Sequence, residues 1–327
     1  MDAQGGGLMT QSSRALAQTW GYPRHRRFVE HVRTAATEWF RAKGMPVNSK
    51  YPYILADWND WPKNIILPEV AKYIAATSES QRTCGRNIPL HKYVHHGLSS
   101  QAMLFNLAGP LLIRGDLTPL RNVIERKGLV WPDSGSCALF EYEDRNIFNE
   151  DSGQPTSIDL VVLDVHGHPK IFLESKFVEQ EFGGCSVFGA GDCDGKNPAR
   201  DISTCYLHHI GRKYWNLMEK YGVNNGNIGK DAVCILANYY QFFREAIFAF
   251  EHQGVFLLLC DERSPVFYSD GQKGPRGIMP FLVGLLPDQL KQHVSYVTVQ
   301  ELVAEIESRG DMGWIAEFRS KYGLALA

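Results

Sequence analysis

The chain has 327 residues, of which 44% are hydrophobic and 21% charged, and its formal net charge is −2. This composition is that of a folded globular protein and excludes a disordered or collagen-like chain. The near-neutral charge also argues against a protein that binds nucleic acid through a strongly basic surface, but it leaves room for a local basic cleft.

The sequence also indicates the compartment of the protein and its relation to membranes. The sequence has no run of about 18 apolar residues, so we expect no membrane span. Residues 1–15 lack a signal peptide's basic-then-apolar pattern and indicate a short disordered lead. The 7 cysteines, an odd number, favour reduced thiols over a disulfide framework. We therefore expect a cytoplasmic protein.

Helical patterns dominate the first part of the chain. Apolar residues recur at helical spacing from Phe28 to Phe40, and Gly44 provides the stop. Ser99 or Ser100 is a suitable N-cap for a later helix. The predicted helices are residues 24–43, 68–77, 99–112 and 118–127. We assign residues 1–97 to a mostly helical N-terminal region.

Strands and helices then alternate. Strands are predicted at residues 137–144, 157–165, 170–178, 231–239 and 255–261. Helices are predicted at residues 204–221, 241–250, 287–293, 298–308 and 313–322. An antiparallel start followed by alternation predicts an α/β fold with a mixed sheet flanked by helices. We place the core at residues 98–265 and a helical C-terminal region, packed on it, at 266–327.

The most informative stretch is a predicted hairpin, SIDLVVLDVHGHPKIFLESKFV, at residues 157–178. If His166 and Gly167 form its two-residue turn, Asp159 lies directly opposite Glu174. Because side chains alternate along a strand, Lys176 shares the face of Glu174. Two carboxylates and one ammonium group therefore converge on one sheet surface.

Such a cluster has a chemical use. Two carboxylates, with backbone or water oxygens, make a hard site suited to Mg²⁺ or Mn²⁺, which can activate water and stabilise charge during phosphodiester cleavage. Lys176 can orient the water or neutralise the phosphate. The alternative is a cross-strand ion pair on a solvated face. The apolar neighbours Val161, Leu163 and Phe172 favour the mouth of a cleft.

Asp159 followed by Glu174-Ser175-Lys176 resembles the D…ExK pattern of the PD-(D/E)XK nuclease superfamily, although Ile158 replaces the proline of that pattern. The order of elements is also similar. Four segments resemble one bacterial branch, the PGN_0703-like restriction endonuclease-related proteins, and together span residues 99–262. They are SSQAMLFNLAGPLL, PTSIDLVV, FLESKFVE and YQFFRE.

The resemblance implies a restriction-endonuclease-like core and metal-dependent hydrolysis of a nucleic acid, usually DNA, in defence or repair. Asp159 and Glu174 would be metal ligands, with the carbonyl of Ser175 as a further ligand. Lys176 would be the catalytic lysine.

The resemblance also implies an additional acid from a preceding helix or strand. The helix offers Gln101, whose amide can bind a metal or phosphate. The strand offers Glu141 or Glu143, of which we favour Glu141; the alternative is a surface carboxylate. Gln241 and Arg244, three apart on a helix, can reach a phosphate together, or else have ordinary surface or capping roles.

Cysteines in a glycine-rich loop at residues 183–197 and just after it form a second candidate site. Cys185, Cys193 and Cys205, followed by His209, can hold zinc tetrahedrally or an iron–sulfur cluster. Unlinked thiols are the alternative. The remaining cysteines are interpreted as core or incidental: Cys84, Cys137, Cys234 and Cys260. The histidines of LHKYVHHG are interpreted as turn or capping residues: His91, His95 and His96.

Two hypotheses follow. The first is a Mg²⁺-dependent endonuclease acting on DNA, with RNA not excluded. The second is a catalytically inactive module with the same fold that binds nucleic acid or a protein partner. A homodimer or a defence-system partner protein remains open, and we expect no membrane partner.

Overall fold

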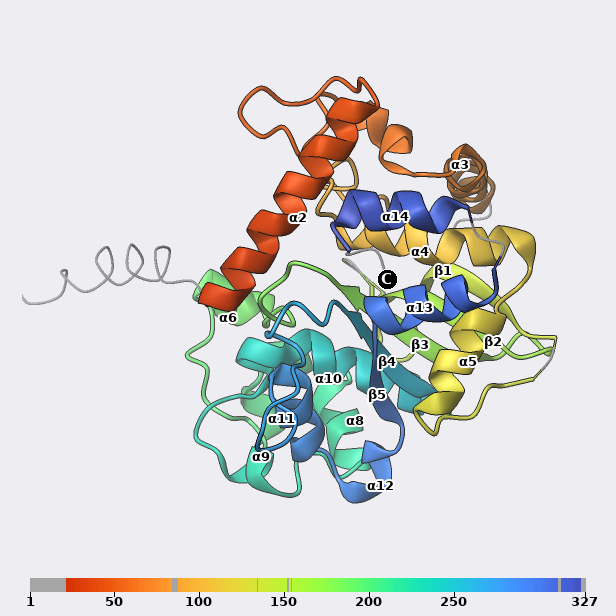
Figure 1. Cartoon of the computed structure of the whole chain (residues 1–327). Helices are drawn as coiled ribbons and strands as arrows, with labels where there is room; N and C mark the ends of the chain where they lie inside the picture. The colour runs from red at the N-terminus through yellow and green to blue at the C-terminus, as the bar shows by residue number, and fades with distance from the viewer. Residues whose placement is uncertain are drawn as a thin grey trace, which may run out of the picture.

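A five-stranded mixed sheet forms the centre of the computed structural model, with strand order β1-β2-β3-β4-β5 (Figure 1). The structure describes residues 22–83, 88–133, 135–151, 153, 155–310 and 313–324. The lead at residues 1–15 and Cys84 therefore lie outside the described residues.

The strands are β1 (Cys137–Glu143), β2 (Ser157–Leu163), β3 (Pro169–Lys176), β4 (Val255–Cys260) and β5 (Val294–Thr298). β1, β2 and β3 are antiparallel neighbours, whereas β3–β4 and β4–β5 are parallel. The predicted α/β class is confirmed.

Helices cover both faces of this sheet, which explains the strand sequences. β4 reads VFLLLC and is buried at every position after Val255, as expected for a strand covered on both sides. On β2, Leu160 and Val162 belong to one hydrophobic core, while Val161 belongs to the other. Alternation along the strand thus supplies both cores.

The first core lies under helices from both ends of the chain (Figure 1). These helices are α2 (Pro23–Ala42), α3 (Pro68–Thr83), α4 (Ser100–Arg114), α5 (Thr118–Arg126), α13 (Val299–Ser308) and α14 (Trp314–Tyr322), with the 3₁₀ helix η1 (Trp58–Asn64) between α2 and α3. Ser99 is the N-cap of α4, as predicted, and its hydroxyl accepts from the Ala102 amide at 3.2 Å.

The second core lies on the opposite face and centres on α10 (Leu236–Glu251) (Figure 1). Other elements on this side are α6 (Ser186–Ala190), η2 (Ile202–Thr204), α7 (Tyr206–His209), α8 (Tyr214–Lys220), α9 (Asn227–Lys230), α11 (Ile278–Leu285) and α12 (Asp288–Lys291). The predicted helix at residues 204–221 is broken, because Gly211 takes a left-handed φ of 85° between α7 and α8.

One predicted strand is absent, and one strand that forms was not predicted. The strand at residues 231–239 does not form: Val233 makes one isolated bridge with Lys196, and α10 begins at Leu236. A short apolar run does not distinguish a buried strand from a buried helix start. The C-terminal region is not wholly helical either, because β5 extends the sheet beside β4.

Within the described ranges, no helix combines the length and the apolar character needed to cross a membrane.

Candidate active site

The hairpin formed by β2 and β3 has the predicted register in its centre, where Leu160 faces Leu173 and Val161 faces Phe172. The predicted two-residue turn was wrong. The Asp164 amide donates to His168 O at 2.9 Å, and Gly167 has a φ of 80°, which is a three-residue loop with a glycine bulge. A register shift between Val162 and Leu163 compensates for the extra residue.

The structure brings Asp159, Glu174 and Lys176 together at the end of this hairpin. Lys176 Nζ donates to Glu174 Oε1 at 2.8 Å. The Ser175 amide donates to Asp159 Oδ2 at 2.8 Å. Glu174 and Lys176 are only 4% and 8% exposed, so the alternative of an ion pair on a solvated face does not describe them.

Gln241 of α10 connects the lysine to the carboxylates. Its Oε1 accepts from Lys176 Nζ at 2.9 Å. Its Nε2 donates to Glu174 at 2.7 Å and to Glu245 at 2.8 Å. Glu245 is fully buried and was missed by the sequence analysis. The sequence could have indicated it, because Glu245 lies four residues after Gln241 and therefore on the same face of a helix.

Glu141 of β1 and Gln101 of α4 form the other side of this cluster. Gln101 Nε2 donates to Glu141 Oε1 at 2.6 Å and to Pro89 O at 2.9 Å, and its Oε1 accepts from the His91 amide at 2.8 Å. Both polar atoms of the Gln101 side-chain amide are therefore already hydrogen-bonded to protein groups. Ser157 Oγ donates to Glu141 Oε2 at 2.9 Å.

An uncommon backbone conformation places Glu141 here. Its φ is 54°, in the left-handed region that a residue with a side chain seldom adopts. The ladder pairs Phe140 with Leu160 and Tyr142 with Ile158, so the interruption falls where Glu141 would face Asp159. Glu143, the other candidate acid, is exposed at the end of β1.

Burial and mutual repulsion govern the carboxyl groups. Burial raises the pKa of Asp159 well above its ordinary value, and the charges of Glu174 and Glu141 raise it further. Burial raises the pKa of Glu141 to about 7, against the effect of its own hydrogen bonds. Burial and then the charge of Glu174 raise the pKa of Glu245 to about 8. A cation would relieve this crowding of negative charge.

Lys176 responds in the opposite sense. Burial alone would lower its pKa, but the charges of Glu174, Glu179 and Glu245 outweigh burial and raise it. Glu179 also accepts from the Phe177 amide at 2.6 Å. Lys176 is therefore a fixed positive charge at neutral pH.

The donor set suits a hard cation. Carboxylate oxygens of Asp159 and Glu174 and the carbonyl of Ser175 are ligands of the type that Mg²⁺ and Mn²⁺ prefer. Two buried oxygens nearby, Ser175 Oγ and Glu245 Oε2, have no hydrogen-bond partner. No group of three His, Cys, Asp or Glu side chains in the described part of the chain is arranged to hold an ion, so a metal here would need backbone and water oxygens besides the two carboxylates.

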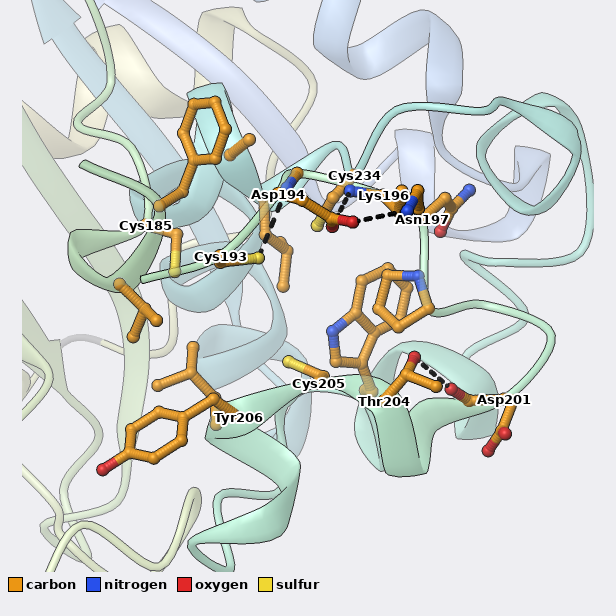
Figure 2. A pocket seen from close by; sticks show the side chains of 18 of the residues that line it. Cys185, Cys193, Asp194, Lys196, Asn197, Asp201, Thr204, Cys205, Tyr206 and Cys234 are labelled. Atoms are coloured by element: carbon orange, nitrogen blue, oxygen red, sulfur yellow. Dashed lines mark hydrogen bonds and ion pairs between the residues drawn. The ribbon is translucent and has the colours of Figure 1, made fainter. Parts of the chain in front are cut away.

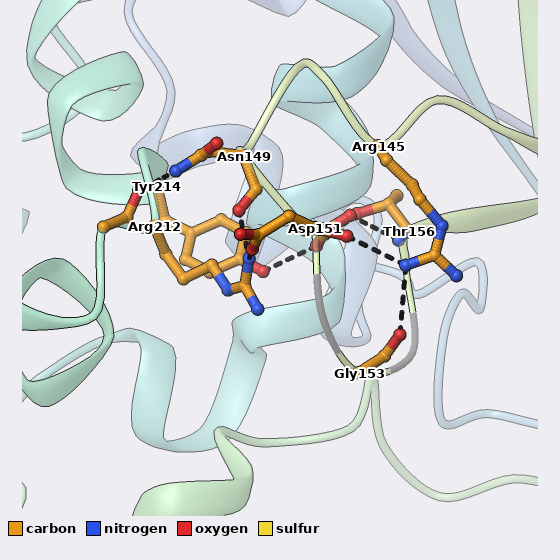
Figure 3. Close-up of polar contacts among 9 residues, drawn as sticks. Arg145, Asn149, Asp151, Gly153, Thr156, Arg212 and Tyr214 are labelled. Carbon is orange, nitrogen blue, oxygen red and sulfur yellow. Dashed lines mark hydrogen bonds and ion pairs between the residues drawn. The ribbon is translucent and has the colours of Figure 1, made fainter.

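Arg244 contacts other groups than Gln241 does, and their joint contact with a phosphate stays a prediction. Its guanidinium carbon lies 5.1 Å from the centre of the Tyr240 ring, and Glu150 and Tyr214 are also near. Glu150 accepts from Tyr214 Oη at 2.6 Å and from the Thr156 amide at 2.6 Å, in the hydrogen-bond network around Arg145 and Thr156 (Figure 3).

The second candidate site is also rearranged. Cys185, Cys193 and Cys205 line one cavity, as the sequence suggested, but the fourth cysteine on its wall is Cys234 (Figure 2). His209, the predicted fourth ligand, is exposed and does not line the cavity.

The histidines of LHKYVHHG lie in a turn. His95 O accepts from the Leu55 amide at 3.2 Å, and His96 O accepts from Asn64 Nδ2 at 2.8 Å. Burial, followed by the neighbouring histidines, lowers the pKa of His96 to about 4. A neutral, backbone-bound turn matches the capping interpretation.

The mixed sheet, its flanking helices and the cluster at the hairpin define a restriction-endonuclease-like α/β protein. The family model described as "restriction endonuclease associating with ARP" matches residues 32–323, and the chain belongs to this family. Neither a curated protein nor a solved structure matches the chain. Family membership suggests restriction-endonuclease-like nuclease activity.

Proposed function

We propose that this protein is a metal-dependent endonuclease of the PD-(D/E)XK type that hydrolyses phosphodiester bonds of DNA, in a defence or repair setting. The observation that carries the proposal is the buried contact of Lys176 with Glu174, beside Asp159 on the neighbouring strand. Family membership supports the nuclease class. Metal, substrate and residue roles are our inference from the geometry.

Asp159, Glu174 and the carbonyl of Ser175 would hold Mg²⁺ or Mn²⁺, which supplies Lewis acidity and a more acidic bound water. Lys176 keeps its proton because the surrounding carboxylates raise its pKa, so it faces the phosphate as a positive charge that stabilises the transition state. Gln241 holds Lys176 and Glu174 in one geometry.

Gln101 acts on this site through Glu141. The Gln101 amide is bound to Glu141, Pro89 and His91, so we assign it a positioning role and not a ligand role. Glu141 is the acid that the strand adds to the cluster. Since burial raises its pKa to about 7, it can hold or release a proton near neutral pH.

Cleavage of supercoiled plasmid with Mg²⁺, and then Mn²⁺, tests the proposal. Lys176→Met should lower the rate by roughly 10²–10³-fold, because it removes one preorganised charge. Asp159→Asn should abolish metal-dependent cleavage. Lys170→Met, on the same strand but at its other end, is the matched control and should cleave like the wild type. Equal cleavage by all four proteins would assign the activity to a contaminant or another site.

A partner protein belongs to this proposal. The family is described as associating with ARP, and we propose that this chain also acts together with such a partner. Single-stranded RNA and DNA should be assayed beside plasmid, and DNA is the expected substrate. Cleavage of RNA alone would overturn the substrate assignment.

A catalytically inactive binding module is the second candidate, favoured by one observation: α4 places Gln101, not an acid, beside the cluster. Thermal denaturation with Mg²⁺ separates the two. An ion that binds only the folded state raises the melting temperature by mass action. The nuclease proposal expects this rise in the wild type and its loss in Asp159→Asn.

A further inference from the structure

Four cysteine side chains line one cavity on the side of the sheet that α10 covers (Figure 2). Cys185 directly precedes α6, Cys205 directly precedes α7, and Cys234 lies just before α10. Cys193 belongs to the loop between them. The cavity measures about 450 Å³. Residues up to 49 positions apart in the sequence therefore direct their thiols to one place.

The backbone around two of these cysteines is arranged for sulfur ligands. The Gly195 amide donates to Cys193 Sγ at 3.4 Å, within a turn where Gly195 has a φ of 73°. The amides of Leu236 and Ala237 interact with the Cys234 thiol. Amide hydrogen bonds to sulfur stabilise the thiolate charge that metal binding creates.

These turns are also tied to one another. The Cys234 amide donates to Gly195 O at 2.8 Å, which joins the Cys193 turn to Cys234. The Cys185 amide donates to Leu236 O at 3.0 Å. The cysteine-bearing segments are thus held against the first turn of α10.

Charge at the cavity favours an anionic occupant. Lys196 and Arg200 lie on its wall, although Lys196 also pairs with Asp194 at 2.7 Å. An assembly bound by four thiolates carries net negative charge, which these side chains would partly neutralise.

The size of the cavity, about 450 Å³, discriminates between occupants. Zinc binds sulfur at about 2.3 Å, which requires the four sulfur atoms to lie within about 4 Å of one another. In the described part of the chain, no three His, Cys, Asp or Glu side chains are arranged to hold a single ion. A cubane cluster needs a wider spacing, because each cysteine binds a different iron. We propose that Cys185, Cys193, Cys205 and Cys234 bind a [4Fe–4S] cluster.

The cluster would brace the loop between β3 and α10. The backbone N–H of Gln241 donates to Gly183 O at 3.1 Å. The start of this loop therefore already contacts the helix that carries Gln241. Cross-linking the loop to Cys234 would order residues 185–234, which form only short helices. This role does not depend on the nuclease proposal.

The test is the metal content of the full-length chain purified without oxygen. Wild-type protein should contain iron and acid-labile sulfide in equal amounts and show the broad visible absorption of iron–sulfur charge transfer. Cys→Ser at each of the four positions should remove most of this absorption. Cys137→Ser and His209→Ala are matched controls, since neither residue lines the cavity, and both should retain it.

The metal content of the wild-type protein tests the cluster even if a serine variant fails to fold. Stoichiometric zinc without iron would overturn the cluster, and the absence of both metals would overturn the site. Loss of absorption in His209→Ala with retention in folded Cys234→Ser would overturn the ligand set. Circular dichroism identifies which variants are folded.

Discussion

Two buried lysines show how surroundings decide the behaviour of one residue type. Carboxylates around Lys176 overcome burial and raise its pKa. Lys321 is fully buried, and burial lowers its pKa well below the ordinary value, opposed only by the Glu317 carboxylate. Its Nζ lies 4.5 Å from the centre of the Trp39 ring and donates to Asn64 O. The first lysine suits a site, whereas the second is a stability cost.

Lys321→Met should therefore stabilise the protein at neutral pH, by about 1–4 kcal/mol, because an apolar chain of similar volume replaces a desolvated ammonium. Asn64 O keeps a donor, since Asn106 Nδ2 also bonds it at 3.1 Å. Denaturant unfolding measures the change.

The pH dependence of this gain checks its cause. The folded chain binds the Lys321 proton less tightly than the unfolded chain, so the penalty is fully present below the folded pKa and fades as pH rises toward the ordinary lysine value. The advantage of Lys321→Met should shrink with it. An advantage that stays constant to high pH would contradict the electrostatic explanation.

Glu245 supplies a second pH-dependent contribution, of opposite sense. Its pKa in the folded chain is about 8, above the ordinary glutamate value of 4.5. The contribution to stability is therefore fully present below the ordinary pKa and lost as pH rises through about 8. With chelator present, the melting temperature of the wild type should fall more steeply between pH 4.5 and about pH 8 than that of Glu245→Gln.

Glu251→Gln is the control on the same helix, because Glu251 pairs with Lys220 at a partly exposed site. It should follow the wild-type profile. Parallel profiles for wild type and Glu245→Gln would remove Glu245 as the titrating group.

Some of these residues were predictable from the sequence and others were not. Asp159, Glu174 and Lys176 belong to one hairpin, so local alternation and register predicted their convergence. Glu245 lies in α10 and Cys234 just before it, and α10 packs on the sheet from elsewhere in the chain. A carboxylate in an apolar helix, or a thiol just before one, gives no local sign of which groups tertiary packing will place against it.

At the scale of elements, the crossing of α3 and α4 depends on one glycine. A Cβ on Gly109 would lie 2.5 Å from Val70 Cγ1, and Val70 is fully buried. Helix propensity alone favours alanine over glycine by about 1 kcal/mol. Overpacking of a rigid core contact costs typically about 1–3 kcal/mol, so close approach is the larger effect here.

Gly109→Ala should therefore destabilise the protein, and Val70→Ala should relieve the clash when the two are combined. A double-mutant cycle should show the double variant less destabilised than the sum of the single variants. Thermal or denaturant unfolding of the four proteins measures the coupling. Additive effects would mean that α3 moves away without loss.

Helices and strands were predicted correctly where neighbouring residues alone determine them. α2 and α4 combine helical spacing with a stop or a cap, and both were predicted. β5 has only 5 residues and was missed, because pairing with β4 decides its conformation. The hairpin register was predicted in its centre, while the turn depended on Gly167 and on the Asp164 carboxylate, which accepts from the His168 amide at 2.8 Å.

For the whole molecule, the two ends of the chain share one core. Trp39 Nε1 of α2 donates to Glu317 of α14 at 3.1 Å, and Arg263 Nη1 donates to Gly323 O at 2.7 Å. The first hydrophobic core joins residues from α2, α4, the sheet, α13 and α14. We infer that residues 98–265 are not an independently folding unit and that the helical regions are integral parts of it.

A fragment of residues 98–265 should therefore fail to fold. It would lose β5, which pairs along β4 from Phe256 to Cys260, and would expose that edge together with most of the first core. Exposed strand edges and apolar faces favour aggregation.

The fragment should lack the near-ultraviolet circular dichroism of the full chain, and the full chain should unfold in one transition. A soluble fragment with native-like dichroism, or a full chain that unfolds in separate steps for the two ends, would restore the division into a core with additions. Coexpressed residues 266–327 provide the control: if loss of β5 and α13 is the cause, supplying them in trans should recover part of the folded signal.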